Sequence, residues 1–289
     1  MIKIEAHNVY KEFDVKNEAG KREKLVVLEQ FELEVKQGEF LAILGPSGCG
    51  KSSFLNILAG LDRQNSGDIL IDQRSVLDND FNRGVVFQGY ALFPWRTVLE
   101  NVAVGLEIRG VSRTERERIA YEYLTLVGLK SFAKRFPHQL SGGMKQRVAI
   151  ARVLAYQPDI LLMDEPFAAL DAQTRELLQF ELLRIWEADK KTIIFVTHSI
   201  DEAILMADRV AVMTARPGKV KEIIDINLPR PRTGEIRNSP EFAQIRQRAW
   251  ELIKDEVVLA QNLEEKENQA AVNDNWNKQG DEQQHEKVS

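Results

Sequence analysis

Cysteine is nearly absent from this 289-residue chain, which has one, so no internal disulfide is possible. No apolar run approaches the ~20 residues that a membrane-spanning helix needs, and the N-terminus lacks the basic-then-apolar leader of a secreted protein. An excess of positive charge is also lacking, because the net charge is −5. We therefore expect a chain that stays in a reducing compartment, does not bind nucleic acid and reaches a membrane only through a partner.

Negative charge is concentrated at the end of the chain, where the stretch from Ala260 onward has seven acidic and three basic residues. This stretch is rich in Asn, Gln and Glu and has few apolar residues, so we predict that residues 260–289 are disordered. The remainder is close to neutral. With 44% hydrophobic and 29% charged residues in the whole chain, the composition is that of an ordinary folded protein.

The chain is organised around the nine-residue segment GPSGCGKSS. It follows an apolar run at 40–44, which predicts a buried strand, and precedes residues 51–59, which predict a helix ending at Gly60. A strand, a glycine-rich turn and a helix form the context of a phosphate-binding loop. Its glycines let backbone N–H groups approach an anion, and the helix N-terminus adds positive partial charge. The loop residues are Gly45, Pro46, Ser47, Gly48, Cys49, Gly50, Lys51, Ser52 and Ser53.

Several side chains of this loop have predicted roles. Lys51 offers a full positive charge to the β- and γ-phosphates of a nucleoside triphosphate. Ser52 offers a hydroxyl to Mg²⁺, and Ser53 is a secondary candidate. Cys49 is expected near the γ-phosphate end, where the helix N-terminus and Lys51 favour its thiolate. The alternative for Cys49 is a small, unreactive residue that fills the loop.

A pair of carboxylates follows the buried strand predicted at 159–163, where Asp164 and Glu165 precede Pro166. In nucleotide hydrolases the first acid holds Mg²⁺ through water, and the second can polarise the attacking water. Adjacent carboxylates need a nearby cation, which a Mg²⁺–phosphate site supplies. We therefore predict Asp164 as a Mg²⁺-site residue and Glu165 as the catalytic base.

Two more polar residues follow predicted strands. Gln88 ends the strand at 83–88, and His198 comes directly after the strand at 192–196. Because ligands bind beyond the carboxyl ends of strands in open α/β sheets, Gln88 is placed to touch Mg²⁺ or the attacking water, and His198 to contact the γ-phosphate. The alternatives are a surface glutamine without a role and a structural histidine.

Ser141, Gly142 and Gly143 open another predicted helix and form a second anion-binding arrangement, with a hydroxyl, exposed N–H groups and a helix dipole. The same three residues also make an ordinary N-cap. Well before the phosphate loop, Tyr10 and Phe13 supply aromatic rings. Such a ring can stack on a base or pack in the core, and the residues alone leave both open.

The remaining pattern divides the chain into regions. Residues 1–36 predict two antiparallel strands around a polar turn at 17–20, and residues 89–157 predict helices. An edge strand or hairpin is predicted at 220–228, followed by an extended linker and an amphipathic helix at 240–258. We therefore predict a nucleotide-binding domain at 1–228 with a helical part at about 89–157, a linker and helix at 229–259, and the tail at 260–289.

Taken together, the motifs resemble the ATP-binding cassette of ABC transporters. GPSGCGKSS matches the Walker A sequence, ILLMDEP at 160–166 the Walker B sequence, and LSGGMKQR at 140–147 the family signature. Gln88 matches the Q-loop, residues 169–171 match the D-loop, and His198 matches the switch histidine. Phe13 matches the adenine-stacking aromatic residue better than Tyr10 does. The match covers roughly residues 1 to 250.

The resemblance implies an α/β fold, a P-loop NTPase core with an antiparallel β-subdomain and an inserted α-helical subdomain. It implies ATP and Mg²⁺ as cofactors and a homodimer in which the signature residues of one subunit act on the ATP of the other. It also implies integral membrane permease subunits, which would follow the motion of the cassettes through residues 88–102. A solute-binding protein would act via the permease, and the chain would lie peripherally at the cytoplasmic face of the inner membrane.

A narrower resemblance points to the nitrate, sulfonate and taurine importer ATPases. It rests on LFPWRTVLENV at 92–102, DEPFAALD at 164–171 and the Arg-Pro-Gly turn at 216–218. It implies an ATP-hydrolysing subunit of a bacterial importer for a small anion. Most aromatic residues at 90–95 are expected in the core, but we predict that Trp95 and its neighbours belong to a docking surface for the membrane subunits.

The alternative function is that of a soluble ABC-type ATPase in DNA repair or translation. Repair members carry a long coiled coil between phosphate loop and signature, whereas this interval is short and lacks sustained heptads. Translation factors usually carry two cassettes in one chain. A P-loop kinase, the third reading, leaves the signature and His198 unexplained. Membrane fractionation with copurified partners separates the first two.

Overall fold

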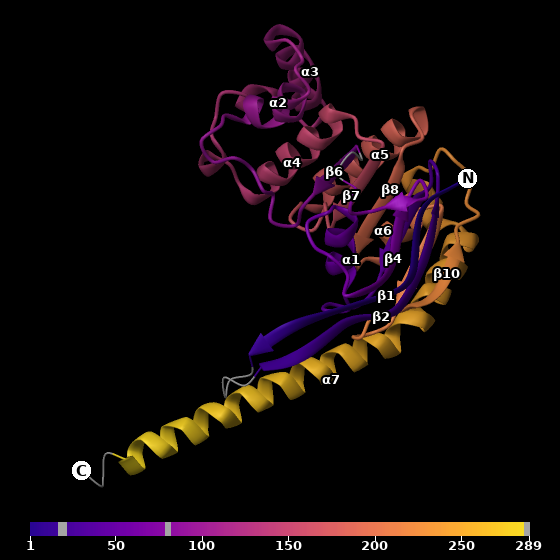
Figure 1. Ribbon diagram of the computed structural model, residues 1–289. Coiled ribbons are helices and arrows are strands. Elements are labelled where there is room, and N and C mark those ends of the chain that lie inside the picture. Colours follow the sequence, from indigo (N-terminus) through magenta and orange to yellow (C-terminus); the bar gives the residue numbers. More distant parts are fainter. Residues whose placement is uncertain (17–21, 79–81, 286–289) are drawn as a thin grey trace.

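The computed structural model describes residues 1–16, 22–78 and 82–285, with side chains for all of them except Lys16 and residues 267–285. The turn predicted at 17–20 therefore lies outside the described residues. Two β-sheets are flanked by helices, and a separate group of helices stands to one side of them (Figure 1). The predicted α/β fold, with an antiparallel β-subdomain and an inserted α-helical subdomain, is confirmed.

The N-terminal sheet is antiparallel and has the order β2-β1-β4-β5. Its strands are β1 (Ile2–Lys16), β2 (Arg22–Lys36), β4 (Ser66–Ile71) and β5 (Arg74–Ser75). From Phe31 to Lys36, β2 alternates buried and exposed residues. This period of two is that of a strand with one face on the core, as its sequence predicted.

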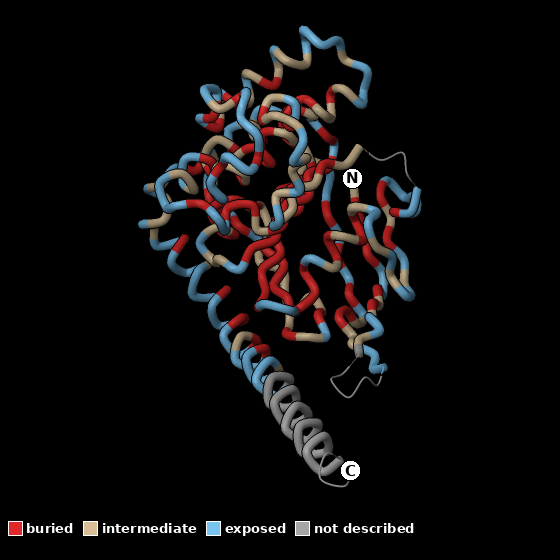
Figure 2. Tube along the Cα trace, turned by 90° about the vertical axis from the view of Figure 1, so that its left-hand side faces the viewer, coloured by how far each residue is buried: buried red, intermediate tan, exposed pale blue. Residues whose placement is uncertain are grey.

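The central sheet has the order β10-β9-β3-β8-β7-β6, with five parallel strands and β10 as an antiparallel edge. Along β3, the side chains of Phe40, Ala42 and Leu44 join one hydrophobic cluster, and those of Leu41 and Ile43 join the other. Both faces of the sheet are therefore covered, as is typical of parallel sheets, and buried residues gather along these strands (Figure 2). The strands are β3 (Phe40–Leu44), β6 (Arg83–Val86), β7 (Ile160–Asp164), β8 (Thr192–Thr197), β9 (Arg209–Met213) and β10 (Val220–Asp225).

The helical subdomain is inserted between β6 and β7. It consists of α2 (Val98–Ile108), α3 (Arg113–Leu126) and α4 (Gly142–Tyr156), with short 3₁₀ turns at Lys130–Phe132 and Pro137–Gln139. Around the central sheet lie α1 (Lys51–Leu58), α5 (Ala172–Ala188) and α6 (Ile200–Met206), and a 3₁₀ helix (Gly234–Asn238) precedes α7 (Pro240–His285). The N-cap residue of α2, Thr97, forms a capping box with Glu100, and that of α4 is Ser141.

Helix α7 differs from the prediction. It runs from Pro240 to His285, whereas the sequence predicted a helix ending near residue 258 and a disordered tail from 260. The polar composition of that stretch argues against a packed core. It does not argue against a helix, because Glu, Gln, Lys and Ala are good helix formers. The last buried residue described in α7 is Ala260.

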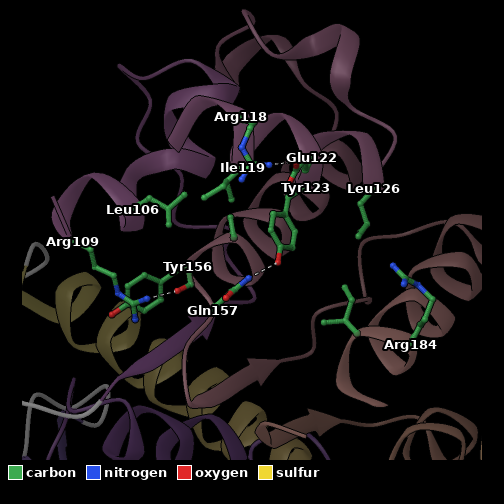
Figure 3. A pocket seen from close by; sticks show the side chains of 12 residues that line it. Leu106, Arg109, Arg118, Ile119, Glu122, Tyr123, Leu126, Tyr156, Gln157 and Arg184 are labelled. Carbon is green, nitrogen blue, oxygen red and sulfur yellow. Dashed lines mark hydrogen bonds and ion pairs between the residues drawn. The ribbon is translucent and has the colours of Figure 1, made fainter. Parts of the chain in front are cut away.

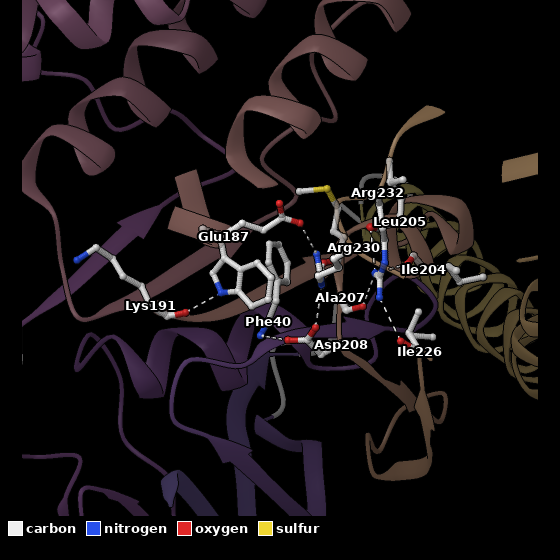
Figure 4. A network of polar contacts seen from close by, with 12 residues as sticks. Phe40, Glu187, Lys191, Ile204, Leu205, Ala207, Asp208, Ile226, Arg230 and Arg232 are labelled. Carbon is white, nitrogen blue, oxygen red and sulfur yellow. Dashed lines mark hydrogen bonds and ion pairs between the residues drawn. The ribbon is translucent and has the colours of Figure 1, made fainter. Parts of the chain in front are cut away.

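The segment between β10 and α7 is anchored by two arginines (Figure 4). Arg232 is 4% exposed and donates to four backbone carbonyl oxygens, those of Ile204, Leu205, Ala207 and Ile226. This burial lowers the pKa of Arg232 to about 10. Arg230 donates to Asp208 at 2.8 Å and lies 4.3 Å from the ring centre of Trp186. The predicted linker is therefore held on the core rather than free.

Candidate nucleotide-binding and catalytic site

The phosphate-loop motif occupies the turn between β3 and α1. Gly50 is the N-cap residue of α1 with φ +102°, and Gly48 has φ +70°, both in the left-handed region that favours glycine. A Cβ on Gly50 would lie 2.7 Å from Leu28 Cδ2 and 3.0 Å from the carbonyl oxygen of Val27. Strand β2 therefore closes one side of the loop, and only glycine fits between them.

Lys51 lies inside this loop. Its ammonium group donates to the carbonyl oxygens of Gly45 at 2.9 Å and Pro46 at 2.7 Å, and the residue is 6% exposed. Ser47 and Gly48 are exposed at the outer side of the same turn. The loop thus combines a buried cation with an accessible backbone, which is the arrangement that a bound phosphate chain uses.

Ser52 and Asp164 meet across the carboxyl ends of β3 and β7. The Ser52 hydroxyl donates to Asp164 Oδ1 at 3.1 Å. Burial, together with the neighbouring Glu165 carboxylate, raises the pKa of Asp164, although the Ser52 hydrogen bond and Lys51 oppose this. A hydroxyl and a carboxylate are the oxygen ligands that Mg²⁺ takes, and a divalent cation would stabilise the charged form of this carboxylate. The residues present therefore fit a Mg²⁺ ion.

Glu165 and His198 form a second pair at the same edge of the sheet, where Glu165 follows β7 and His198 follows β8. Glu165 Oε2 lies 3.2 Å from His198 Nδ1. Glu165 has φ +45°, which is unusual for a residue other than glycine, and its N–H donates to the carbonyl oxygen of Val196. Backbone strain of this kind gathers at functional sites, because the surrounding structure must hold it.

Gln88 and the signature residues lie outside these contacts. Gln88 is exposed in the turn after β6. Ser141 accepts from the N–H of Met144 at 3.3 Å, so it is the N-cap of α4, one of the two readings of that motif. Among the described residues, the hydrogen bonds and ion pairs that join Lys51, Ser52, Asp164, Glu165 and His198 do not reach Ser141, Gly142 or Gly143. Gly143 instead lies beside the D-loop, where an added Cβ would stand 3.3 Å from the carbonyl oxygen of Ala169.

The helix that carries the signature is tied to the segment after Gln88. Arg152 of α4 donates to the carbonyl oxygens of Tyr90 at 3.1 Å and Ala91 at 2.7 Å. Both acceptors have positive φ, +63° and +47°. Arg152 is a residue that the sequence analysis missed, because its partners lie about sixty residues earlier in the chain. These two hydrogen bonds connect the segment after Gln88 directly to the helix that carries the signature.

Phe13 lies on β1 with its ring partly accessible, 36% exposed, and the Lys11 ammonium is 4.5 Å from the ring centre. It pairs with Leu25 on β2, two residues before the Val27 that borders Gly50. An aromatic ring near the phosphate loop is therefore available for a base, and adenine stacking by Phe13 stays a prediction.

Cys49 departs from its predicted reactivity. The residue is fully buried, and this burial raises the pKa of its thiol despite the opposing charge of Lys51. The expected thiolate character is therefore wrong, because desolvation outweighs the cation and the helix end. The alternative of a small, unreactive residue that fills the loop agrees with the structure.

Two contacts of the loop were not predicted. Gly218, in the turn after β9, packs directly on the carbonyl group of Cys49. Ser47 and Gly48 border a cavity of about 100 Å³ whose other walls come from Arg216 and from Ala260, Leu263 and Glu264 of α7. The Arg-Pro-Gly turn at 216–218 was visible in the sequence and could have drawn attention to the contact between Gly218 and Cys49. No sequence pattern placed α7 beside the phosphate loop.

A cleft of about 420 Å³ between the helical subdomain and α5 is separate from this site (Figure 3). Arg109, the C-cap residue that follows α2, donates to the carbonyl oxygen of Tyr156, and its guanidinium lies 3.8 Å from the ring centre of the same residue. Tyr156 is the last residue of α4, whereas Ser141 caps its first turn. None of the residues predicted for the nucleotide site lines this cleft, which therefore lies at the far end of α4.

Comparison with known proteins agrees with this geometry. The family model described as ABC transporter matches residues 28–168. An uncharacterized ABC transporter ATP-binding protein of Methanocaldococcus jannaschii is 52% identical over 257 residues, covering 89% of this chain and 93% of that protein. A solved ATP-binding cassette, a dimer in a post-hydrolysis state bound to ADP and Pi, is similar with a TM-score of 0.69 and 36% identity. That alignment covers 78% of this chain and all of the cassette.

The chain therefore belongs to the ABC transporter ATP-binding proteins, and it is an ATPase whose hydrolysis of ATP is coupled to transport. Within this family it belongs with the nitrate and sulfonate import ATPases. The nitrate import ATP-binding protein NrtD of Synechocystis and the aliphatic sulfonates import ATP-binding protein SsuB of Bacillus cereus are each 46% identical to it. Each alignment covers 77% of this chain and 86% of the relative. No helix of the described residues is long and apolar enough to cross a membrane.

Proposed function

We propose that this chain is the ATP-hydrolysing subunit of a bacterial ABC importer that energises uptake of a small anion such as nitrate, a sulfonate or taurine. The observation that carries the proposal is the 46% identity, over most of the chain, to a nitrate and to a sulfonate import ATP-binding protein. The site is consistent with it, because a phosphate-binding loop and two acidic residues meet at one sheet edge.

In the proposed mechanism, the backbone N–H groups of Gly48–Lys51 and the Lys51 ammonium bind the phosphates of ATP. Ser52, Gln88 and Asp164 would hold Mg²⁺, which neutralises phosphate charge when bound. Glu165 polarises the water that attacks the γ-phosphate. His198, 3.2 Å from Glu165, contacts the γ-phosphate from the neighbouring strand. Phe13 stacks on the adenine.

Two copies of the chain would form the working unit. Among the described residues no hydrogen bond or ion pair ties the signature residues Ser141–Gly143 to the phosphate loop of their own chain, and in the proposed dimer they complete the ATP site of a second copy. Two such contacts related by a two-fold axis close the dimer. ATP then stabilises the closed pair, and hydrolysis with phosphate release reopens it.

The permease contact is proposed at residues 88–102. Trp95 is 71% exposed, which is unusual for so large an apolar side chain, and Phe93 packs against it at 5.6 Å between ring centres. The buried Asn101 holds the segment through hydrogen bonds to the backbone of Phe93, Arg96 and Thr97. A rigid segment with an exposed aromatic ring suits a membrane subunit that must follow the motion of the cassette. The solute-binding protein would act via that permease, with this chain at the cytoplasmic face of the inner membrane.

The test is to tag the chain in its native cell, isolate membranes and identify the integral membrane proteins that copurify with it. Removal of the gene should then abolish uptake of one of nitrate, taurine or another sulfonate, while a control nutrient is taken up normally. If the chain stays in the soluble fraction, and if uptake of all three anions is unchanged, the alternative of a soluble ABC-type ATPase is favoured.

A further inference from the structure

Glu202, on the first turn of α6, stands at the centre of the contacts around His198, and neither the motifs nor the comparisons give it a role. We infer that Glu202 is a positioning residue that holds the His198 loop against helix α5, which begins at the D-loop. The inference rests on the proposed roles of His198 and Glu165 in hydrolysis.

On the side of the loop, Glu202 binds both neighbours of His198. The Thr197 hydroxyl donates to Glu202 Oε2 at 2.8 Å, and the same hydroxyl oxygen accepts from the Ser199 N–H at 3.0 Å. The Ser199 hydroxyl in turn accepts from the Glu202 N–H at 3.3 Å. The backbone on each side of His198 is therefore fixed relative to one carboxylate.

On the other side, the same carboxylate meets α5. Gln179 donates its side-chain amide to Glu202 Oε1 at 3.1 Å, and Arg175 Nε lies 3.9 Å from that oxygen. Arg175 also donates to the carbonyl oxygen of Leu170 at 2.9 Å. Since Leu170 is part of the D-loop, Glu202 links that loop to the switch histidine.

The contacts form a closed ring. From Glu165 the chain runs through the D-loop to Leu170, which Arg175 binds, and Arg175 faces Glu202. Glu202 fixes the loop of His198, and His198 returns to Glu165 at 3.2 Å. The His198 side chain is 65% exposed, so packing does not fix its position. The ring of polar contacts must do so instead.

The burial of Glu202 indicates that its carboxylate does more than make the protein surface polar. Its side chain is 14% exposed, and burial raises the pKa of its carboxyl although Thr197 and Arg175 oppose this. A buried carboxylate destabilises the fold unless hydrogen bonds satisfy it. An apolar residue at this position could not accept the hydrogen bond from Thr197. Two donors, the Thr197 hydroxyl and the Gln179 amide, bind this carboxylate, and Arg175 Nε lies 3.9 Å from it.

The experiment compares steady-state ATP hydrolysis by the full chain, or by its complex with the permease, for the Glu202→Leu, His198→Ala and doubly substituted variants. A misplacement of about 1 Å at a catalytic group costs up to ~10²-fold in rate. We expect Glu202→Leu to lower kcat ~10- to ~100-fold while the affinity for MgATP changes less than about two-fold. In the His198→Ala background the same substitution should have little further effect, since it acts through His198.

Three further variants keep the test decisive. Thr197→Val is nearly isosteric and removes only the hydroxyl that bridges Glu202 and Ser199, so it should lower kcat in the same way even if Glu202→Leu fails to fold. Glu181→Gln, which alters a carboxylate on α5 that binds Arg184, is the matched control and should leave kcat unchanged. Recovery of most activity by Glu202→Gln, which still accepts from Thr197, also supports positioning.

The inference is overturned if Thr197→Val and Glu202→Leu keep normal kcat, or if the effects of Glu202→Leu and His198→Ala simply multiply. In either case, low activity of His198→Ala would leave the proposed function standing. Normal activity of His198→Ala would instead reject the catalytic role of His198, and the positioning role of Glu202 with it.

Discussion

Replacing Gly218 by Ala should distort the phosphate loop, although Gly218 is not part of that loop. Gly218 lies in the turn after β9, and an added Cβ would stand 3.2 Å from the carbonyl carbon of Cys49 and 2.7 Å from Met213 Cε. The carbonyl oxygen of Cys49 would be closer still. Gly218 itself cannot move away from these atoms, because its N–H donates to the carbonyl oxygen of Val27 at 2.8 Å and its carbonyl oxygen accepts from the Glu29 N–H at 3.3 Å. The turn is therefore fixed to β2, and the loop must give way.

The size of the effect follows from these distances. Real Cβ atoms essentially never approach other heavy atoms closer than 3.0 Å. The carbonyl carbon of Cys49 already lies near this limit. Its oxygen is bonded to it at about 1.2 Å, so the oxygen can overlap the added Cβ by about 1 Å. A shift of about 1 Å in a catalytic loop costs up to ~10²-fold in rate, and overpacking of a tight site costs about 1–3 kcal/mol of stability. We therefore expect weaker MgATP binding and kcat/KM lower by ~10- to ~100-fold.

The measurement is titration of the purified chain with a fluorescent ATP analogue, together with steady-state hydrolysis and thermal unfolding. Gly234→Ala is the matched control, because its Cβ would meet Glu176 Oε1 at 3.4 Å and Phe180 Cζ at 3.6 Å, which are ordinary contacts. If Gly218→Ala binds MgATP within about two-fold of the unaltered chain and hydrolyses it normally, the turn does not support the phosphate loop and the reasoning fails.

Three further predictions concern the proposed site. Glu165→Gln should bind MgATP normally, hydrolyse it at least ~10²-fold more slowly and accumulate as an ATP-bound dimer in size-exclusion chromatography; near-normal turnover would reject Glu165 as the base. Cys49 should react with maleimide only slowly in the native chain and rapidly after denaturation, because its thiol is buried with a raised pKa; fast native labelling would contradict the burial. Trp95→Ala should spare ATP binding by the isolated chain but weaken copurification of the permease, and unchanged assembly would remove Trp95 from the docking surface.

The sequence predicted those parts of the site whose structure depends on segments that are adjacent in the chain. The phosphate loop needs a strand, a glycine turn and a helix in succession, and residues 40–58 contain all three without help from distant segments. The approach of Glu165 to His198 was also predictable in outline, because both follow strands of one parallel sheet and therefore emerge at the same edge.

The parts that it did not predict depend on segments far apart in the chain. Gly218 and Cys49 are in contact although nearly 170 residues separate them. Arg175 and Glu202 carry no motif, and their partnership depends on how α5 packs beside α6. Their types and spacing are equally compatible with solvent-exposed helix surfaces, so only the tertiary arrangement distinguishes the two cases.

Cys49 shows why the charges close to it in the chain were not enough to predict its reactivity, even inside the motif. A helix N-terminus and a lysine two residues away both favour a thiolate, and both are present as predicted. Gly45 borders the sulfur, since an added Cβ there would lie 2.8 Å from Cys49 Sγ, and the cysteine is fully buried, so the cost of desolvation exceeds the stabilisation by Lys51. The turn at 216–218 packs on the carbonyl group of this cysteine and so helps to keep the residue buried. A substitution that loosens that turn should make Cys49 more reactive as it weakens ATP binding.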